Sequence, residues 1–229
     1  MFYFRCEVNC KDLVITTDIL SVSSRCVFGT CEKGKLGLYS WDLFYRSVTE
    51  TDGKKWNRVA DLESIALSNT SSKNLALKAD VLHPEVSYVV RLWYRWLQHE
   101  SFSEYSFITG RPPYGGNCSV SPATGKAYQT MFTFKCAGWQ TKNMPLLYVF
   151  SYYDPYTQLK PVLFRAEEER FLVKLAPGDP NDNFRLKILF SVIDSLGARM
   201  DTQKLIKVTS FFYSLELIRP IMKSTFKPF

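Results

Sequence analysis

The sequence predicts an all-β chain that forms two tandem antiparallel β-sandwiches of the fibronectin type III or immunoglobulin-like class. Apolar and polar residues alternate in short blocks separated by turn residues, as expected of half-buried strands. The order of these blocks repeats after the segment RPPYGG, residues 111–116. Two prolines stiffen the backbone there and two glycines allow it to turn sharply. We therefore expect a first domain over 1–111 and a second over 112–209.

The first half has two long alternating blocks, GLYSWDLFYRS (37–47) and SYVVRLWYRW (87–96). Each collects apolar side chains on one face, which we expect to be buried. Those residues are Tyr39, Trp41, Leu43 and Tyr45 in the first block and Tyr88, Val90, Leu92 and Tyr94 in the second. Further strands are expected near 19–28, 74–79 and 102–109.

The second half repeats this pattern. Strands are expected near 117–121, 128–136, 146–153, 160–166, 169–175, 184–193 and 203–209. The tail, 210–229, is too short for a third sandwich but is rich in apolar residues that are costly to leave in water. We expect it to begin a further segment, to pack poorly alone and to be cleaved rapidly after Thr209.

The cysteine spacing favours disulfides over a zinc site. The spacings are CxxxC and CxxxxC, and both histidines lie far from every cysteine. If the first two strands of the second sandwich run antiparallel with Cys118 and Cys136 facing inward, these two meet beside Trp139. The same geometry in the first half favours Cys10 with Cys26 and Cys6 with Cys31. The local pairs, Cys6 with Cys10 and Cys26 with Cys31, remain open.

Two Asn-x-Ser sequons, at Asn69 and Asn117, indicate the same oxidising compartment as the cysteines. Asn69 lies in a polar loop, and strand phase directs Asn117 outward while Cys118 faces inward. Both are predicted to carry glycans on the extracellular side. The start, MFYFRCEVNC, puts an arginine and a cysteine where a signal peptide has its apolar core. We therefore expect the chain to be part of a larger protein.

Charge and motifs exclude several function classes. The net charge is +7, but the basic residues are scattered and no nucleic-acid-binding motif is present, so we expect no nucleic-acid partner. A weak affinity for acidic glycans or anionic lipid headgroups is compatible with this charge. There is no GxSxG, phosphate-binding loop or framed carboxylate pair, so we expect neither an enzyme nor a cofactor.

One loop offers oxygen donors for a metal ion. Asp179, Asp182 and Asn183 lie together in PGDPNDN, which suits calcium. An ordinary turn uses the same residue types, and we favour the turn and predict no metal site.

The first half also carries the pattern of a tyrosine corner. Leu82 precedes Tyr88 by six residues, so the phenol hydroxyl is expected to cap backbone near the preceding turn. In the second half Leu175 is followed by a longer loop and by Phe184. Phenylalanine can fill a core but cannot make this hydrogen bond, so that corner must be held in another way.

The candidate binding residues are Arg91, Trp93 and Arg95. They alternate with the predicted core residues and should form a cation-aromatic stack on an exposed sheet face. Packing against a neighbouring strand or against the other domain is the alternative interpretation.

Several motifs together resemble a known family. The stretch RPPYGGNCSVSPATGKAYQTMFTFKCAGW followed by PLLYVFSYY, preceded by CEVNC, CVFGTC and Trp41, is similar to the REJ module, the receptor-for-egg-jelly region of polycystin-like membrane proteins. The resemblance covers most of residues 6–153. It implies fibronectin-like domains within a large extracellular region that transmembrane helices tether. It also implies neighbouring domains as partners.

Two functions follow from these observations. The first is an extracellular interaction or spacer module of a polycystin-like receptor, with an unidentified protein or glycan ligand. The second is a soluble secreted binding protein, such as a cytokine-receptor-like fragment. Transmembrane helices downstream in the parent reading frame would favour the first, and an upstream signal peptide with a natural stop after Phe229 the second.

Overall fold

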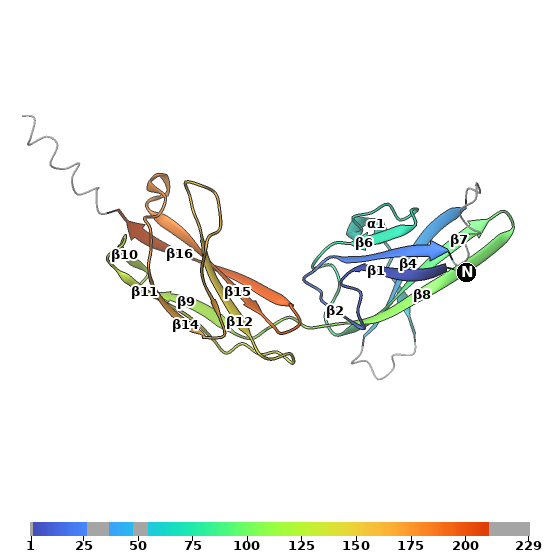
Figure 1. The fold of residues 1–229 in the computed structure, drawn as a ribbon, viewed down its shortest axis with the longest axis horizontal. Helices are drawn as coiled ribbons and strands as arrows, with labels where there is room; N and C mark the ends of the chain where they lie inside the picture. The colour runs from blue at the N-terminus through green and yellow to red at the C-terminus, as the bar shows by residue number, and fades with distance from the viewer. Residues whose placement is uncertain (1, 27–36, 48–54, 211–229) are drawn as a thin grey trace, which may run out of the picture. The chain divides into compact units, whose positions relative to one another are not determined.

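The computed structural model describes residues 2–26, 37–47 and 55–210. It confirms the predicted all-β fold class, because each half is a sandwich of one three-stranded and one five-stranded sheet (Figure 1). The chain divides into two compact units between Pro112 and Pro113, within the RPPYGG segment, except that Leu196–Ala198 group with the first unit. Cys31 and most of the predicted tail lie outside the described residues.

The first unit contains eight strands and one short helix. They are β1 (Phe2–Val8), β2 (Leu13–Val14), β3 (Leu20–Cys26), β4 (Leu38–Ser47), β5 (Asn57–Arg58), α1 (Leu62–Ile65), β6 (Asn74–Leu77), β7 (Val86–Trp96) and β8 (His99–Thr109). One sheet has the strand order β1-β3-β6 and the other β2-β8-β7-β4-β5.

The second unit also contains eight strands. They are β9 (Asn117–Ser121), β10 (Thr124–Lys126), β11 (Met131–Ala137), β12 (Leu147–Tyr153), β13 (Val162–Ala166), β14 (Arg170–Lys174), β15 (Arg185–Ile193) and β16 (Arg199–Thr209). Their sheets have the orders β14-β11-β9 and β10-β16-β15-β12-β13.

The two units have the same strand order. In each, the first strand pairs antiparallel with the third in the small sheet, and a short second strand then pairs parallel with the last strand of the large sheet. The chain therefore changes sheets early in both units. The short second strand covers the end of the last strand of the large sheet, whose backbone groups would otherwise be unpaired there.

Each sandwich has its own apolar core. In the first unit Trp41, Leu43, Tyr88, Val90 and Leu92 are buried, as their strand phase predicts, but Tyr45 at the strand end is 37% exposed. The core of the second unit is aromatic at its centre: Phe134, Phe150 and Phe190 are mutually in contact, with ring centroids 5.5–5.8 Å apart. Such edge-to-face pairs add to the free energy gained from burial.

The tyrosine corner of the first unit is present. The backbone N–H of His83 donates a hydrogen bond to the Tyr88 hydroxyl over 3.0 Å, and the Tyr88 ring and Leu82 are buried. Burial of the phenol raises the pKa of Tyr88, which keeps the hydroxyl neutral.

The matching corner of the second unit is built from backbone. Phe184 is only partly buried and has a left-handed backbone with φ 58°, and the first buried residue of β15 is Leu186. The Gly178 N–H donates to the Val208 carbonyl, and the Val208 N–H donates to the Phe184 carbonyl. Phe184 therefore does not take the core position of the tyrosine, and these bonds to β16 hold the corner.

Candidate interaction site

The hinge motif at the start of the second unit is a packed cluster. Cys118 and Cys136 are directly opposite each other on β9 and β11 and form the predicted disulfide, with 4.0 Å between their Cα atoms. Both are fully buried, and Trp139 packs against the same core. A Cβ on Gly116 would lie 2.3 Å from the Trp139 ring, so only glycine fits under the indole. The two glycines, the cysteines and the Gly-Trp pair of this motif thus belong to one packed cluster at the start of the second unit.

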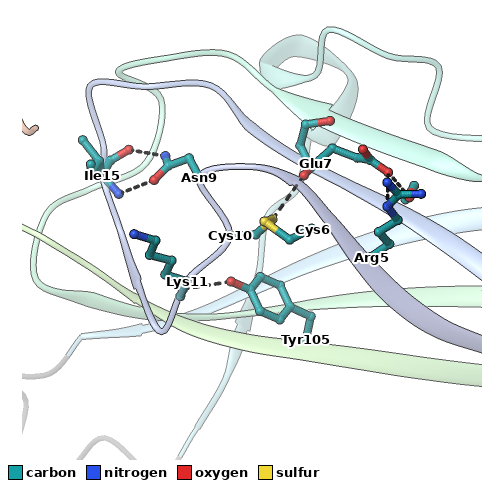
Figure 2. Close-up of a disulfide and its surroundings, with 10 residues drawn as sticks. Arg5, Cys6, Glu7, Asn9, Cys10, Lys11, Ile15 and Tyr105 are labelled. Atoms are coloured by element: carbon teal, nitrogen blue, oxygen red, sulfur yellow. Dashed lines mark hydrogen bonds and ion pairs between the residues drawn. A yellow bond between two sulfur atoms is a disulfide. The ribbon is translucent and has the colours of Figure 1, made fainter. Parts of the chain in front are cut away.

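The disulfide of the first unit differs from the preferred prediction. Cys6 is bonded to Cys10, so the pairings Cys10–Cys26 and Cys6–Cys31 are wrong (Figure 2). The reason is the strand register: Cys6 lies opposite Val22 on β3, whereas Cys26 lies opposite Phe2. The open alternative Cys6–Cys10 is the one found. Its companion, Cys26–Cys31, involves a residue outside the described part of the chain and stays a prediction.

The Cys6–Cys10 loop marks the sheet switch of the first unit (Figure 2). Asn9 has a left-handed backbone, φ 55°, and its side-chain amide both donates to the Ile15 carbonyl and accepts from the Ile15 N–H. The Tyr105 hydroxyl of β8 donates to the Lys11 carbonyl over 2.9 Å. Burial, with a smaller effect of Asp12, raises the pKa of Tyr105 to about 12. These hydrogen bonds hold the connection between β1 and β2 in place.

Both sequons are on the small-sheet side of their units. Asn69 is exposed in the loop before β6, where its side-chain oxygen accepts from the Ser71 N–H over 2.7 Å. Asn117 opens β9 and is exposed, while its neighbour Cys118 is fully buried.

The outer face of the large sheet in the first unit holds the predicted stack, centred on Arg91. The Arg91 guanidinium lies over the rings of Phe44, Trp93 and Phe102, 4.9–5.3 Å from their centroids. It also forms an ion pair with Glu104 at 2.6 Å. Three strands, β4, β7 and β8, contribute to this cluster, so it depends on their register.

Asp42 extends the cluster on one side. It accepts a hydrogen bond from the Trp93 indole over 2.8 Å and forms an ion pair with Arg58. Arg95 does not join the stack, because it pairs with Glu100 across the β7–β8 hairpin. The structure thus brings two of the three predicted binding residues together and places the third one row away.

This face can make protein contacts. Phe102 is 56% exposed and Ile108 47% exposed on the same strand, while Arg91, Arg95 and Arg58 each have an acidic partner on the face. Aromatic and arginine side chains that are already held in place lose little entropy on binding and dominate protein interfaces. We call the outer-facing residues Asp42, Phe44, Arg58, Arg91, Trp93, Phe102 and Glu104 the arginine–aromatic face.

Sequence reasoning missed part of this face. Phe44, Phe102 and Glu104 are not among the predicted site residues, although all three occupy the outward phase of their strands. The alternation alone gives that phase. What it does not give is which residues of β4 and β8 lie beside Arg91, because that requires the register.

The loop considered for calcium has its oxygens engaged by the protein. The Asp179 carboxylate accepts from the Asn181 N–H, Asp182 pairs with Arg185, and the Asn183 side chain accepts from Lys207. In the described part of the chain no three His, Cys, Asp or Glu residues gather as a metal site would require. The same residues include no helix long and apolar enough to cross a membrane.

Comparison with known proteins shows which proteins this chain is similar to. The human polycystin family receptor for egg jelly is 24% identical over 210 residues, which cover 86% of this chain and 9% of that protein. The N-terminal four Ig domains of Dscam1 isoform 6.44 align over 91% of this chain and 51% of theirs, with 14% identity and a TM-score of 0.27. The same four domains of Dscam1 isoform 4.44 align over 85% of this chain and 41% of theirs, with 10% identity and a TM-score of 0.27.

This chain spans only about a tenth of the human relative's length, as that 9% coverage shows. The model of the REJ domain family matches residues 1–224. With the match extending over nearly the whole sequence, the chain belongs to the REJ domain family.

Proposed function

We propose that this chain is a non-enzymatic extracellular interaction and spacer module of a polycystin-like receptor. Membership of the REJ domain family supports the receptor context. Two disulfides and two exposed sequons support a position on the extracellular side of the membrane or in a secreted form. Asn69 and Asn117 carry N-glycans in this proposal.

The observation that carries the interaction role is the arginine–aromatic face. It presents an exposed phenylalanine beside an arginine whose charge Glu104 neutralises. A partner that covers this face desolvates rings and an ion pair that is already formed, which costs less than burying a free cation. The partner is therefore a protein surface, either a neighbouring domain of the same membrane-anchored chain or a separate protein.

Glycan placement supports the same face. Asn69 lies in the loop before β6, in the small sheet, so its glycan would shield that side of the first unit. The large sheet holds no sequon on any of its strands. Extracellular domains need uncovered protein surface where they bind other proteins, and in this unit the arginine–aromatic face supplies it.

Site-specific photo-crosslinking tests the proposal. A photoreactive amino acid replaces Phe102 in the full-length parent receptor on the surface of living cells. The matched control is Leu67, which is also 56% exposed but lies outside the large sheet. We expect a defined crosslinked protein species, within the receptor or with a partner, from position 102 and not from position 67. Glycosidase treatment of the same receptor should lower the mass of the fragment that contains this module.

Two outcomes would contradict the proposal. If positions 67 and 102 give the same crosslinks or none at all, the arginine–aromatic face is not an interaction surface. If the module lacks glycans and its asparagines are accessible only from the cytoplasm, the extracellular assignment fails.

A further inference from the structure

The positive charge of this chain is concentrated in its second half. Residues 113–209 contain 12 Lys and Arg against 8 Asp and Glu, a net charge of +4, whereas residues 1–112 contain 14 against 13, a net charge of +1. On the outer face of the first unit's large sheet, Arg58, Arg91 and Arg95 are each paired with an acid. Most of the excess positive charge therefore belongs to the second unit, where it must lie on that unit's own surface.

A cleft of about 480 Å³ lies on the outer face of the second unit's large sheet. It is formed over β12, β15 and β16, and its polar lining consists of Ser151, Lys160, Ser191, Arg199, Asp201, Thr202 and Gln203. Ser191 donates to Asp201, which also pairs with Arg199 at 3.5 Å. Hydroxyl, amide and cationic groups thus line one hollow, together with the Asp201 carboxylate, which Ser191 and Arg199 engage.

Unpaired cations surround the cleft. Strand register places Arg165, Val149 and Ser191 in one row across the sheet, and Lys187 lies on the same outward phase of β15. Lys160, Arg165 and Lys187 make no ion pair within the described residues. Arg199 lies opposite Ile193 of β15, and Ile193 is six residues along that strand from Lys187. At the rise of a β-strand, the face between Lys187 and Arg199 is therefore about 20 Å long.

We propose that this cleft binds an acidic polysaccharide of the glycosaminoglycan type. Carboxylate or sulfate groups along an extended sugar chain match cations that are spread over such a length, and ring hydroxyls match Ser151 and Gln203. The extracellular source of this ligand rests on the proposed function. The cleft itself is separate from the arginine–aromatic face, which lies in the first unit.

The geometry disfavours other occupants. Backbone groups of β15 are bonded to β12 and β16 on both sides, so a peptide cannot add as a strand here. The one aromatic residue in the lining, Phe190, is 1% exposed and offers no platform on which nucleic-acid bases could stack. A glycan on Asn117 projects from the small sheet on the other face and leaves the cleft open.

The test compares two double variants of the whole chain, produced with its glycans. Lys160→Gln with Lys187→Gln removes two charges beside the cleft. Lys135→Gln with Lys174→Gln removes two exposed charges from the outer face of the small sheet, so the net charge is the same. We expect heparin affinity to fall about tenfold in the first variant and less than about twofold in the second. Equal losses would show non-specific attraction and overturn the proposal.

A second variant separates shape from charge. Ser151→Trp fills the cleft without changing the charge, and we expect it to weaken heparin binding to a similar extent. Unchanged binding would show that the cleft is not the site. Hyaluronan, which carries only carboxylates, and dextran sulfate, which carries only sulfates, identify the anionic group that is recognised. Tighter binding to duplex DNA or to phosphatidylserine vesicles than to every polysaccharide would contradict the assignment.

Failure of this proposal is distinguishable from failure of the proposed function. The charge and cleft variants should not alter crosslinking from position 102, since they change only the second unit. Conversely, an intracellular module could still bind heparin in solution through this cleft.

Discussion

At the scale of single residues, small side chains and one hydroxyl have the sharpest roles. Gly116 lies beneath the Trp139 ring, and Gly138, with φ 76°, adopts a backbone that side chains disfavour. Tyr88 provides the acceptor for the His83 N–H. The two glycines contribute no side-chain area and the Tyr88 hydroxyl is a single polar group, yet each satisfies a constraint that few other residue types can meet.

Gly116→Ala should destabilise the second unit. The added Cβ would lie 2.3 Å from the indole of Trp139, so the ring must move out of its packed position. We expect a loss of about 2 kcal/mol in the free energy of unfolding. Gly110→Ala is the control, because its Cβ would lie 3.7 Å from Leu13 in ordinary contact. Chemical denaturation of both variants measures the difference, and equal stability would contradict the packing argument.

Tyr88→Phe should cost about 1 to 2 kcal/mol of stability, because the His83 N–H loses its acceptor while the ring remains in the core. Tyr45→Phe is the control, since Tyr45 is more exposed and lies on the same sheet. Thermal unfolding should show a lower Tm only for the first variant. If both variants unfold like the parent chain, the hydroxyl is not a cap.

Stability should fall as the pH rises above about 10. Burial, with smaller effects of Glu169, raises the pKa of Tyr148 to about 12. Between about pH 10 and pH 12 the unfolded state releases this proton while the folded state keeps it, so unfolding is favoured. Tyr148→Phe should flatten the decline, and Tyr156→Phe, at an exposed residue, should not. Denaturation curves at several alkaline pH values decide; an identical decline in both variants would reject this cause.

At the scale of elements, the long strands can be predicted from the sequence, whereas the sheet switches and the strand register cannot. Alternation predicts the long strands β4, β7, β12 and β15, because each has one buried face. Strands of two or three residues, such as β2 and β10, leave no periodic signal, and their parallel pairing comes from tertiary structure. The two sheet switches were therefore not predicted.

Register also explains why one disulfide is the preferred prediction and the other is only an open alternative. Cys118 and Cys136 lie on the first two long strands of their unit and face inward, so simple antiparallel pairing brings them together. In the first unit a register shift between Cys6 and Val8 accompanies the end of β1, and Val22 occupies the position opposite Cys6. Residue types alone do not encode that offset.

The two described disulfides should differ in their accessibility to reductant. Cys6 is exposed and its loop to Cys10 is short, whereas Cys118 and Cys136 are fully buried. A thiolate must reach the sulfur it attacks, so Cys6 and Cys10 should be reduced first under native conditions. Mild reduction followed by alkylation and peptide mapping measures the order. Simultaneous labelling of all four cysteines before unfolding would contradict the burial shown by the structure.

At the scale of the whole molecule, the chain repeats one topology with two different surfaces. In both units the chain changes sheets between the first and second strands, and the sequon lies in or just before a strand of the small sheet. The outer face of the large sheet has paired charges and aromatic rings in the first unit, and a cleft with unpaired cations in the second. A shared scaffold thus carries two chemically distinct surfaces, one for each of the two proposed interactions.

The second unit should fold without the first. Its buried core residues all lie between Cys118 and Val208, and its disulfide closes within β9 and β11. A fragment of residues 112–210 therefore retains every residue of that core and both sheets. We expect a single cooperative unfolding transition and a protected Cys118–Cys136 bond.

A shorter fragment, 112–198, provides the control for this prediction. It lacks β16, which pairs with β15 along its whole length and supplies the buried residues Ile206 and Val208. The loss of these side chains and of the central strand pairing should abolish cooperative unfolding. Circular dichroism during thermal denaturation compares both fragments with the whole chain. If 112–210 lacks a cooperative transition that the whole chain displays, the second unit depends on the first, and the boundary at the double-proline hinge does not separate independent domains.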